Sequence, residues 1–260
     1  MGLPNEKKEK IEFLLVKTIE NKLKRYARES HSMPFLVRLI QDSRKVAAYS
    51  FIHSIATSLG MSIYEKVSMI LAEDNCIECF RNYDLGSVIS KNQKSVIDNI
   101  IRELRNNERK PNYENDMQII LNASPKNGKQ QKDGKIVDFY MIRDDSEYLF
   151  EIKTVKPNID IFTKTKVKLL EWIARKRKPI RSILALPYNP YFPNPYKRFT
   201  NQNLMQEGVD FLVGDEYWNF IAGEKIFEDL LDIFDKVGKK WKEDILAKIE
   251  KVAIEKMENF

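Results

Sequence analysis

Two apolar segments, 135–142 and 148–155, constrain the fold of this chain more than any other feature. Both are rich in β-branched and aromatic residues, and the short polar break between them contains Asp144-Asp145, a pair typical of a tight hairpin turn. If these two residues form the loop, pairing back along both arms places Asp138 directly opposite Glu151. The pattern therefore predicts a β-hairpin with two carboxylates on one face.

Opposed carboxylates among apolar neighbours repel each other, and a divalent cation removes the conflict. Mg²⁺ suits this pair, because it binds through one or two carboxylates together with substrate phosphate. Lys153 lies on the same face of the strand as Glu151. There its side chain can orient or help deprotonate a metal-bound water and stabilise the negative charge that develops on the phosphate. We therefore predict Asp138 and Glu151 as metal ligands and Lys153 as a catalytic residue. The alternative is a surface hairpin with salt-bridged charges.

The composition favours a soluble globular protein, with 43% hydrophobic and 32% charged residues in a chain of 260. No run approaches the ~18–20 apolar residues of a membrane span, and no signal peptide is evident, so we expect a cytoplasmic protein without membrane contact. The C-x-x-C pair Cys76 and Cys79 has only His31 and His53 as further ligands for zinc. We expect two reduced thiols on a helix.

Positive charge is concentrated after the hairpin. The segment 159–200 contains ten lysines and arginines and two acidic residues, whereas the whole chain has a net charge of +6. A basic segment next to a metal-type hairpin suits a polyphosphate backbone, because neutralising phosphates releases counterions. A solvated helix face is the alternative for any single lysine here.

Helical periodicity and turn residues predict the order of elements. The expected helices cover 5–29, 34–58, 63–73, 92–107, 159–177, 216–221 and 224–257, the last with a possible break at Gly238, and the further strands cover 181–186 and 209–214. Strand–helix–strand spacing after the hairpin implies a right-handed crossover and a mixed sheet flanked by helices, so the fold class is α/β. We expect one domain, 1–260, with a helical part at 1–110, a catalytic core at 111–222 and a helical end at 223–260.

A third acidic ligand has three candidates. The segment 112–122 is ambiguous between strand and helix, and its apolar run suits a strand leading into the site. Glu114 or Asp116 would then approach the metal, as would Glu103 from the preceding helix.

The motif also resembles a known family. Val137-Asp138 and, after a 12-residue gap, Glu151-Ile152-Lys153 look like the PD-(D/E)xK nuclease motif, with Val137 where a proline often stands. The segments VDFY, YLFEIKTVKPN, LPYNPYFPNPYKRF and VGDEYWNFIAG, in this order, resemble the TdeIII-like type II restriction endonucleases and their restriction-endonuclease-like core. In that family the positions of Asp138 and Glu151 are metal ligands, and that of Lys153 orients water.

The resemblance implies Mg²⁺-dependent cleavage of double-stranded DNA at a short palindromic site of the GGNCC type, leaving 5′-phosphate and 3′-hydroxyl ends. A palindromic site implies a homodimer, and host protection implies a cognate DNA methyltransferase. Reading G·C pairs requires basic and amide side chains, for which the candidates are Lys156, Arg181, Asn189, Asn194, Lys197 and Arg198. Two alternatives stay open: a repair or junction-resolving nuclease of the same superfamily, and a non-catalytic DNA-binding module.

Overall fold

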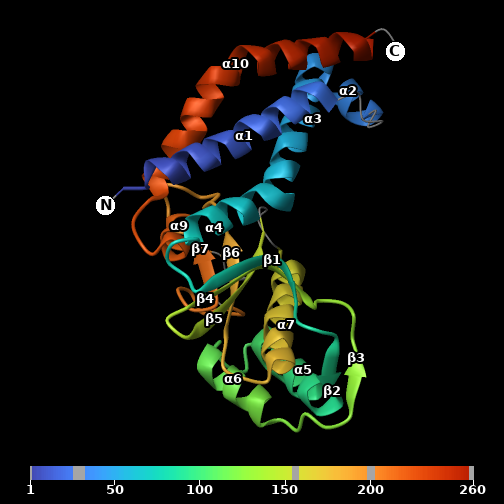
Figure 1. Ribbon diagram of the computed structural model, residues 1–260. Coiled ribbons are helices and arrows are strands. Elements are labelled where there is room, and N and C mark those ends of the chain that lie inside the picture. Colours follow the sequence, from blue (N-terminus) through green and yellow to red (C-terminus); the bar gives the residue numbers. More distant parts are fainter. Residues whose placement is uncertain (1, 26–32, 154–157, 198–202, 258–260) are drawn as a thin grey trace. The chain divides into compact units, whose positions relative to one another are not determined.

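The computed structural model describes residues 2–25, 33–153, 158–197 and 203–257 (Figure 1). The chain forms two compact units, a helical unit of Met1–Val67 with Ile226–Phe260 and a sheet unit of Ser68–Lys225. The first boundary lies well before residue 110, because the two helices that precede the hairpin belong to the sheet unit.

The helical unit is built around two long helices. Its elements are α1 (Asn5–Arg25), α2 (Pro34–Ile40), α3 (Ser43–Ser58), the π-helical turn η1 (Leu59–Ile63), the first residues of α4 (Tyr64–Ala72) and α10 (Phe227–Met257). α10 packs along α1 and α3 (Figure 1). Ala47 and Phe51 on α3 and Val252 on α10 form a small buried core, so apolar stripes at helical spacing hold this unit together.

Three helix boundaries differ from the predictions. The helix expected at 34–58 is divided, because Gln41 adopts a left-handed φ of 55° and Asp42 caps α3 by accepting from Lys45 N at 3.1 Å. Gly60 does not end a helix, since η1 continues into α4 without a break. Gly238 lies inside α10, which is continuous.

The sheet unit holds a five-stranded mixed sheet in the order β1-β4-β5-β6-β7 and a small sheet of β2 and β3. Its elements are β1 (Glu78–Asp84), β2 (Val88–Ser90), α5 (Lys91–Arg105), α6 (Tyr113–Asn122), β3 (Gly128–Gln130), β4 (Ile136–Arg143), β5 (Ser146–Ile152), α7 (Ile159–Lys176), β6 (Arg181–Leu186), β7 (Phe211–Val213) and α9 (Asp215–Ala222). The α/β class and the mixed sheet flanked by helices are confirmed.

The hairpin of β4 and β5 is also confirmed. Asp144 and Asp145 have φ values of 49° and 59°, the left-handed conformation that a two-residue hairpin turn requires at both positions. The ladder pairs Phe139 with Phe150, so the next position along the same register sets Asp138 opposite Glu151.

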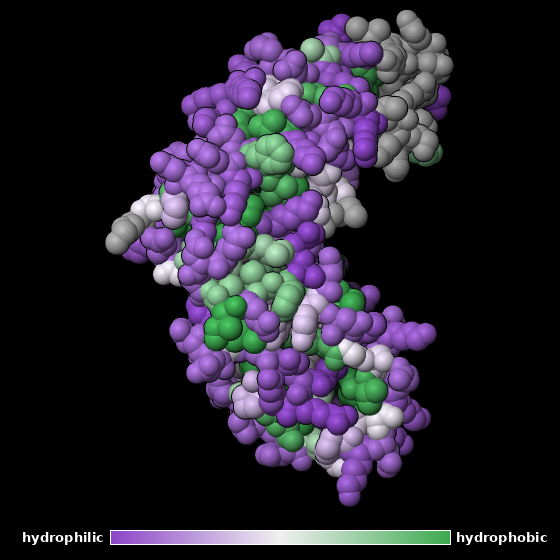
Figure 2. Space-filling view, viewed as in Figure 1, coloured by the Kyte–Doolittle hydropathy of each residue, from purple (hydrophilic) through white to green (hydrophobic). Residues whose placement is uncertain are grey.

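Helices cover both faces of the sheet. Leu169, Leu170, Trp172 and Ile173 of α7 are fully buried in the main core, and α5 and α6 pack on α7 (Figure 1). On the other face, Phe150 contacts the α9 ring of Tyr217, with ring centroids 5.8 Å apart. Hydrophilic side chains cover most of the face shown in Figure 2, while the large apolar side chains of this unit fill its interior.

One ambiguous segment is resolved as a helix, and one further expectation is wrong. The segment at 112–122 is helical (α6), because Asn112 caps it by accepting from Asn115 N at 3.0 Å and Tyr113, Met117 and Ile120 bury one face. Cys79 lies on the edge strand β1 and Cys76 in the turn before it, so the two free cysteines do not lie on a helix.

Candidate active site

The candidate site lies where the β4–β5 hairpin is open, at the end away from its turn. Asp138 is near the start of β4, and its Oδ2 accepts a hydrogen bond of 2.8 Å from the backbone N–H of Ile152. Glu151 is 4% exposed and pairs in register with Leu184 of the parallel strand β6. The hydrogen bonds of the sheet therefore fix both carboxylates.

Lys153 is held beside these carboxylates by backbone and side-chain contacts. Its N–H donates to Ala185 O at 3.0 Å, which extends the parallel pairing one residue beyond β5. Its Nζ lies 2.6 Å from Glu151 Oε1. The structure thus brings Asp138, Glu151 and Lys153 together as predicted from the motif, while their catalytic roles stay a prediction.

The two carboxylates of the site repel each other electrostatically. Burial, and then the neighbouring Glu151 charge, raise the pKa of Asp138 to about 6. Burial acts to lower the pKa of Lys153, but Glu151 and Asp138 outweigh it, and the pKa is raised. The site therefore holds a charged lysine beside a carboxyl that is harder to ionise than a free aspartate.

Sequence reasoning missed a second lysine at this site. Lys168 of α7 extends toward the sheet, and its Nζ lies 2.5 Å from Glu151 Oε2. The ammonium group also lies 5.3 Å from the ring centroid of Trp172, whose Nε1 donates to Gly134 O at 2.7 Å. One signal in the sequence could have found it: Lys168 lies between apolar residues of a crossover helix that must face the sheet.

The basic segment also contains a lysine that serves the fold. Lys166 is fully buried, and its Nζ lies 2.5 Å from Asp210 Oδ2 and 3.7 Å from Asp116 Oδ2. Its ammonium group is enclosed between these two carboxylates, so this lysine of the basic segment is not available to DNA phosphates.

None of the three candidates for a third acidic ligand joins Asp138 and Glu151. Asp116 binds Arg109 at 2.6 Å, and Glu103 binds the same arginine at 2.8 Å. Glu114 is exposed on α6. Across the described ranges, no group of three or more acidic, histidine or cysteine residues has the arrangement of a metal site.

The predicted base-reading residues lie in different surroundings. Arg181 starts β6, at the end of the sheet opposite the site, and donates to Val209 O at 3.1 Å. Asn189, Asn194 and Lys197 follow β6 on the side where β5 carries Glu151, and all three are exposed or half-buried in a loop that an Asn189–Asn194 hydrogen bond of 2.8 Å braces. Lys156 and Arg198 lie outside the described residues.

The donor set fits a hard divalent cation. Two adjacent carboxylates, opposed in the register of the hairpin, supply oxygen ligands. Mg²⁺ keeps several waters and needs few protein ligands, so two carboxylates suffice. Bound there, a divalent cation would be held by Asp138 and Glu151.

Comparisons with known proteins identify the family. The family model described as the type II restriction endonuclease HinfI matches residues 3–238, which include the whole candidate site. The chain therefore belongs to the HinfI family of type II restriction endonucleases and is a site-specific deoxyribonuclease, a class that generally uses a divalent metal and acts on double-stranded DNA. The match supports the type II class and not the TdeIII-like subgroup that the motifs resemble.

Curated relatives carry the same description. The type II restriction enzyme HgiCII of Herpetosiphon aurantiacus is 28% identical over 208 residues, which cover 76% of this chain and 75% of that protein. HgiEI of the same organism is 26% identical over 238 residues, 89% and 86% of the two chains. MjaII of Methanocaldococcus jannaschii is 27% identical over 205 residues, 72% of this chain and 54% of that one. No solved structure matches.

None of the helices in the described part of the chain is long and apolar enough to cross a membrane.

Proposed function

We propose that this restriction endonuclease is Mg²⁺-dependent, that it cleaves double-stranded DNA at a short palindromic site of the GGNCC type, and that it leaves 5′-phosphate and 3′-hydroxyl ends. The observation that carries the proposal is the buried Asp138–Glu151 pair with Lys153 Nζ 2.6 Å from Glu151 Oε1. This arrangement matches what hydrolysis of a phosphodiester needs: oxygen ligands for a hard cation and a cation beside the water.

Asp138, Glu151 and Lys153 have separate roles in the proposed reaction. Asp138 and Glu151 hold Mg²⁺, which when bound supplies Lewis-acid stabilisation of charge on the phosphate. Lys153 orients the attacking water and stabilises the negative charge that develops on the non-bridging oxygens. The water oxygen attacks phosphorus, which forms the new P–O bond and breaks the bond to the 3′ oxygen. The proton that the attacking water loses passes to solvent, and the 3′ oxygen takes up a proton from solvent and leaves as a hydroxyl.

Lys168 acts in this proposal as a positioning residue. Its ammonium group binds the second oxygen of Glu151, so the two lysines together fix the carboxylate plane before the metal binds. Removing Lys168 should therefore alter the site through Glu151 without removing any group that contacts DNA.

Base recognition is proposed for the loop after β6. Asn189, Asn194 and Lys197 lie on the side of the sheet where β5 ends, so a duplex at the catalytic carboxylates is within reach of this loop. Lysine is suited to guanine edges in the major groove, and the side-chain carbonyl of asparagine can accept from cytosine amino groups. The roles of Lys156, Arg181 and Arg198 in DNA contact also stay proposals, and Arg181 lies at the other end of β6, where it donates one hydrogen bond to Val209 O.

The assembly and setting follow from the substrate. A palindromic site favours a homodimer in which each subunit cuts one strand. We also propose that the enzyme works in the cytoplasm together with a DNA methyltransferase that protects the same site.

Digestion of plasmid DNA tests the proposal. With Mg²⁺, the protein should give discrete fragments whose sequenced ends share one short palindrome, and chelation of Mg²⁺ should stop cleavage. Cleavage restricted to branched DNA would instead support a repair or junction-resolving enzyme, and retarded but intact DNA would support a binding module.

A further inference from the structure

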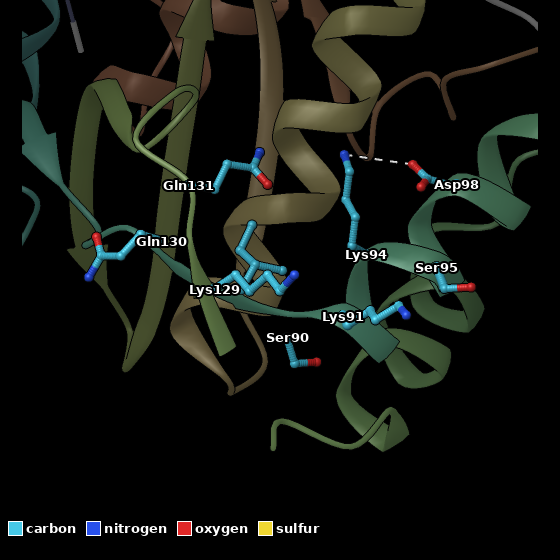
Figure 3. Close-up of a pocket in the computed structure, with 9 residues that line it drawn as sticks. Ser90, Lys91, Lys94, Ser95, Asp98, Lys129, Gln130 and Gln131 are labelled. Carbon is cyan, nitrogen blue, oxygen red and sulfur yellow. Dashed lines mark ion pairs between the residues drawn. The ribbon is translucent and has the colours of Figure 1, made fainter. Parts of the chain in front are cut away.

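A cavity of about 460 Å³ lies between helix α5 and the short strand β3, outside the residues assigned to catalysis. Figure 3 shows Lys91, Lys94 and Ser95 on the α5 side, and Lys129 and Gln131 on the opposite side. The walls thus present ammonium, hydroxyl and amide groups, which is the lining that an anion needs.

Two of the three lysines in the cavity are available for a ligand. Lys94 Nζ lies 2.7 Å from Glu171 Oε1 and 3.6 Å from Asp98 Oδ1, so it is already paired and in turn compensates Asp98 (Figure 3). Lys91 and Lys129 are exposed, and their ammonium groups form no ion pair with any residue that the structure describes. The cavity therefore carries uncompensated positive charge.

The cavity adjoins the candidate active site through helix α7. Lys94 and Gln131 both contact Glu171 Oε1, at 2.7 and 2.8 Å. Lys168, three positions earlier on the same helix, contacts Glu151 at 2.5 Å. Three helical residues span about 4.5 Å, and each DNA strand carries one phosphate about every 3.4 Å of helix axis. A duplex cleaved at Glu151 therefore has backbone phosphates within reach of this cavity.

We propose that the cavity between α5 and β3 binds a backbone phosphate of the DNA duplex, flanking the phosphate that is cleaved, through Lys91 and Lys129. The proposal rests on the proposed nuclease function and adds a second anchoring point for the same substrate. Because the contact is to phosphate, it contributes affinity without sequence preference.

Binding measurements test this site. The cavity variant carries both Lys91→Gln and Lys129→Gln. The control variant carries both Lys240→Gln and Lys242→Gln, which remove the same charge from exposed positions of α10. On a fluorescein-labelled duplex in EDTA, the cavity variant should bind about tenfold more weakly, equally with and without the cleavage site, and its log–log salt dependence should be shallower by about one to two. At saturating DNA its kcat should match the wild type while KM rises.

A neutral backbone analogue gives a sharper readout. One methylphosphonate at the contacted flanking position should weaken binding by the wild type and by the control variant, but not by the cavity variant. Equal sensitivity in all three proteins, or unchanged affinity of the cavity variant, would overturn the proposal. Absence of cleavage by the wild type would count against the nuclease function instead, so the two failures are distinguishable.

Discussion

Replacing Asp138 by asparagine should stabilise the metal-free protein. Burial and the Glu151 charge raise the pKa of Asp138 from 3.8 to about 6, so ionising this carboxyl costs more free energy in the folded protein than in the unfolded chain. Each pKa unit corresponds to about 1.36 kcal/mol, so the charged form costs on the order of 3 kcal/mol of unfolding free energy. Asparagine removes the charge, and its Oδ1 can still accept from Ile152 N–H.

The sign of the pH dependence follows from the raised pKa. A carboxyl that is easier to protonate in the folded state contributes stability below its unfolded pKa, and this contribution is lost as pH rises through about 6. The variant has no such loss, so its advantage over the wild type should be near zero at about pH 4, grow up to about pH 6 and then stay constant.

Thermal unfolding in EDTA across this pH range measures the effect. At about pH 8 the variant should melt roughly 6–12 °C higher, at about 2–4 °C per kcal/mol for a chain of this size. Asp244→Asn on exposed α10 is the matched control and should change little. Added Mg²⁺ should stabilise the wild type more than the variant. A destabilised variant at pH 8, or an advantage that does not change with pH, would refute the reasoning.

Three further substitutions have defined outcomes. Lys168→Met should shift the acid limb of the pH–rate profile for cleavage to higher pH, because Lys168 lowers the pKa of Asp138, whereas Lys168→Arg should keep the wild-type profile. Lys166→Met leaves Asp210 buried without its partner, so denaturant unfolding should show a loss of about 3–5 kcal/mol, part of which Asp210→Asn restores in the double variant. Asp145→Gly should raise the unfolding free energy by up to about 1 kcal/mol with unchanged cleavage, because glycine adopts the positive φ of this turn without strain.

The parts of the fold that the sequence predicted have strong local signals. Apolar runs rich in β-branched and aromatic residues and an Asp-Asp turn define the hairpin, and helical periodicity with a following short apolar run defines α7 and β6. The register then follows from the turn, so the opposition of Asp138 and Glu151 needed no tertiary information.

The parts that the sequence did not predict depend on distant partners. Strand β1 alternates between exposed and half-buried residues and is held by its ladder to β4, more than fifty residues later, so its own pattern is weak. The buried role of Lys166 depends on Asp210, 44 residues away. Helix α6 is a different case, since Asn112 and the spacing of Tyr113, Met117 and Ile120 were readable as a cap and an apolar face.

The central claim is that Asp138, Glu151 and Lys153 form the nuclease active site, and single-turnover cleavage by Glu151→Ala and Lys153→Ala tests it most directly. Each variant should cut plasmid DNA at least about 100-fold more slowly than the wild type in saturating Mg²⁺. Each should still bind the duplex, because neither substitution removes the proposed flanking phosphate contacts. Cleavage at the wild-type rate by either variant would contradict the account.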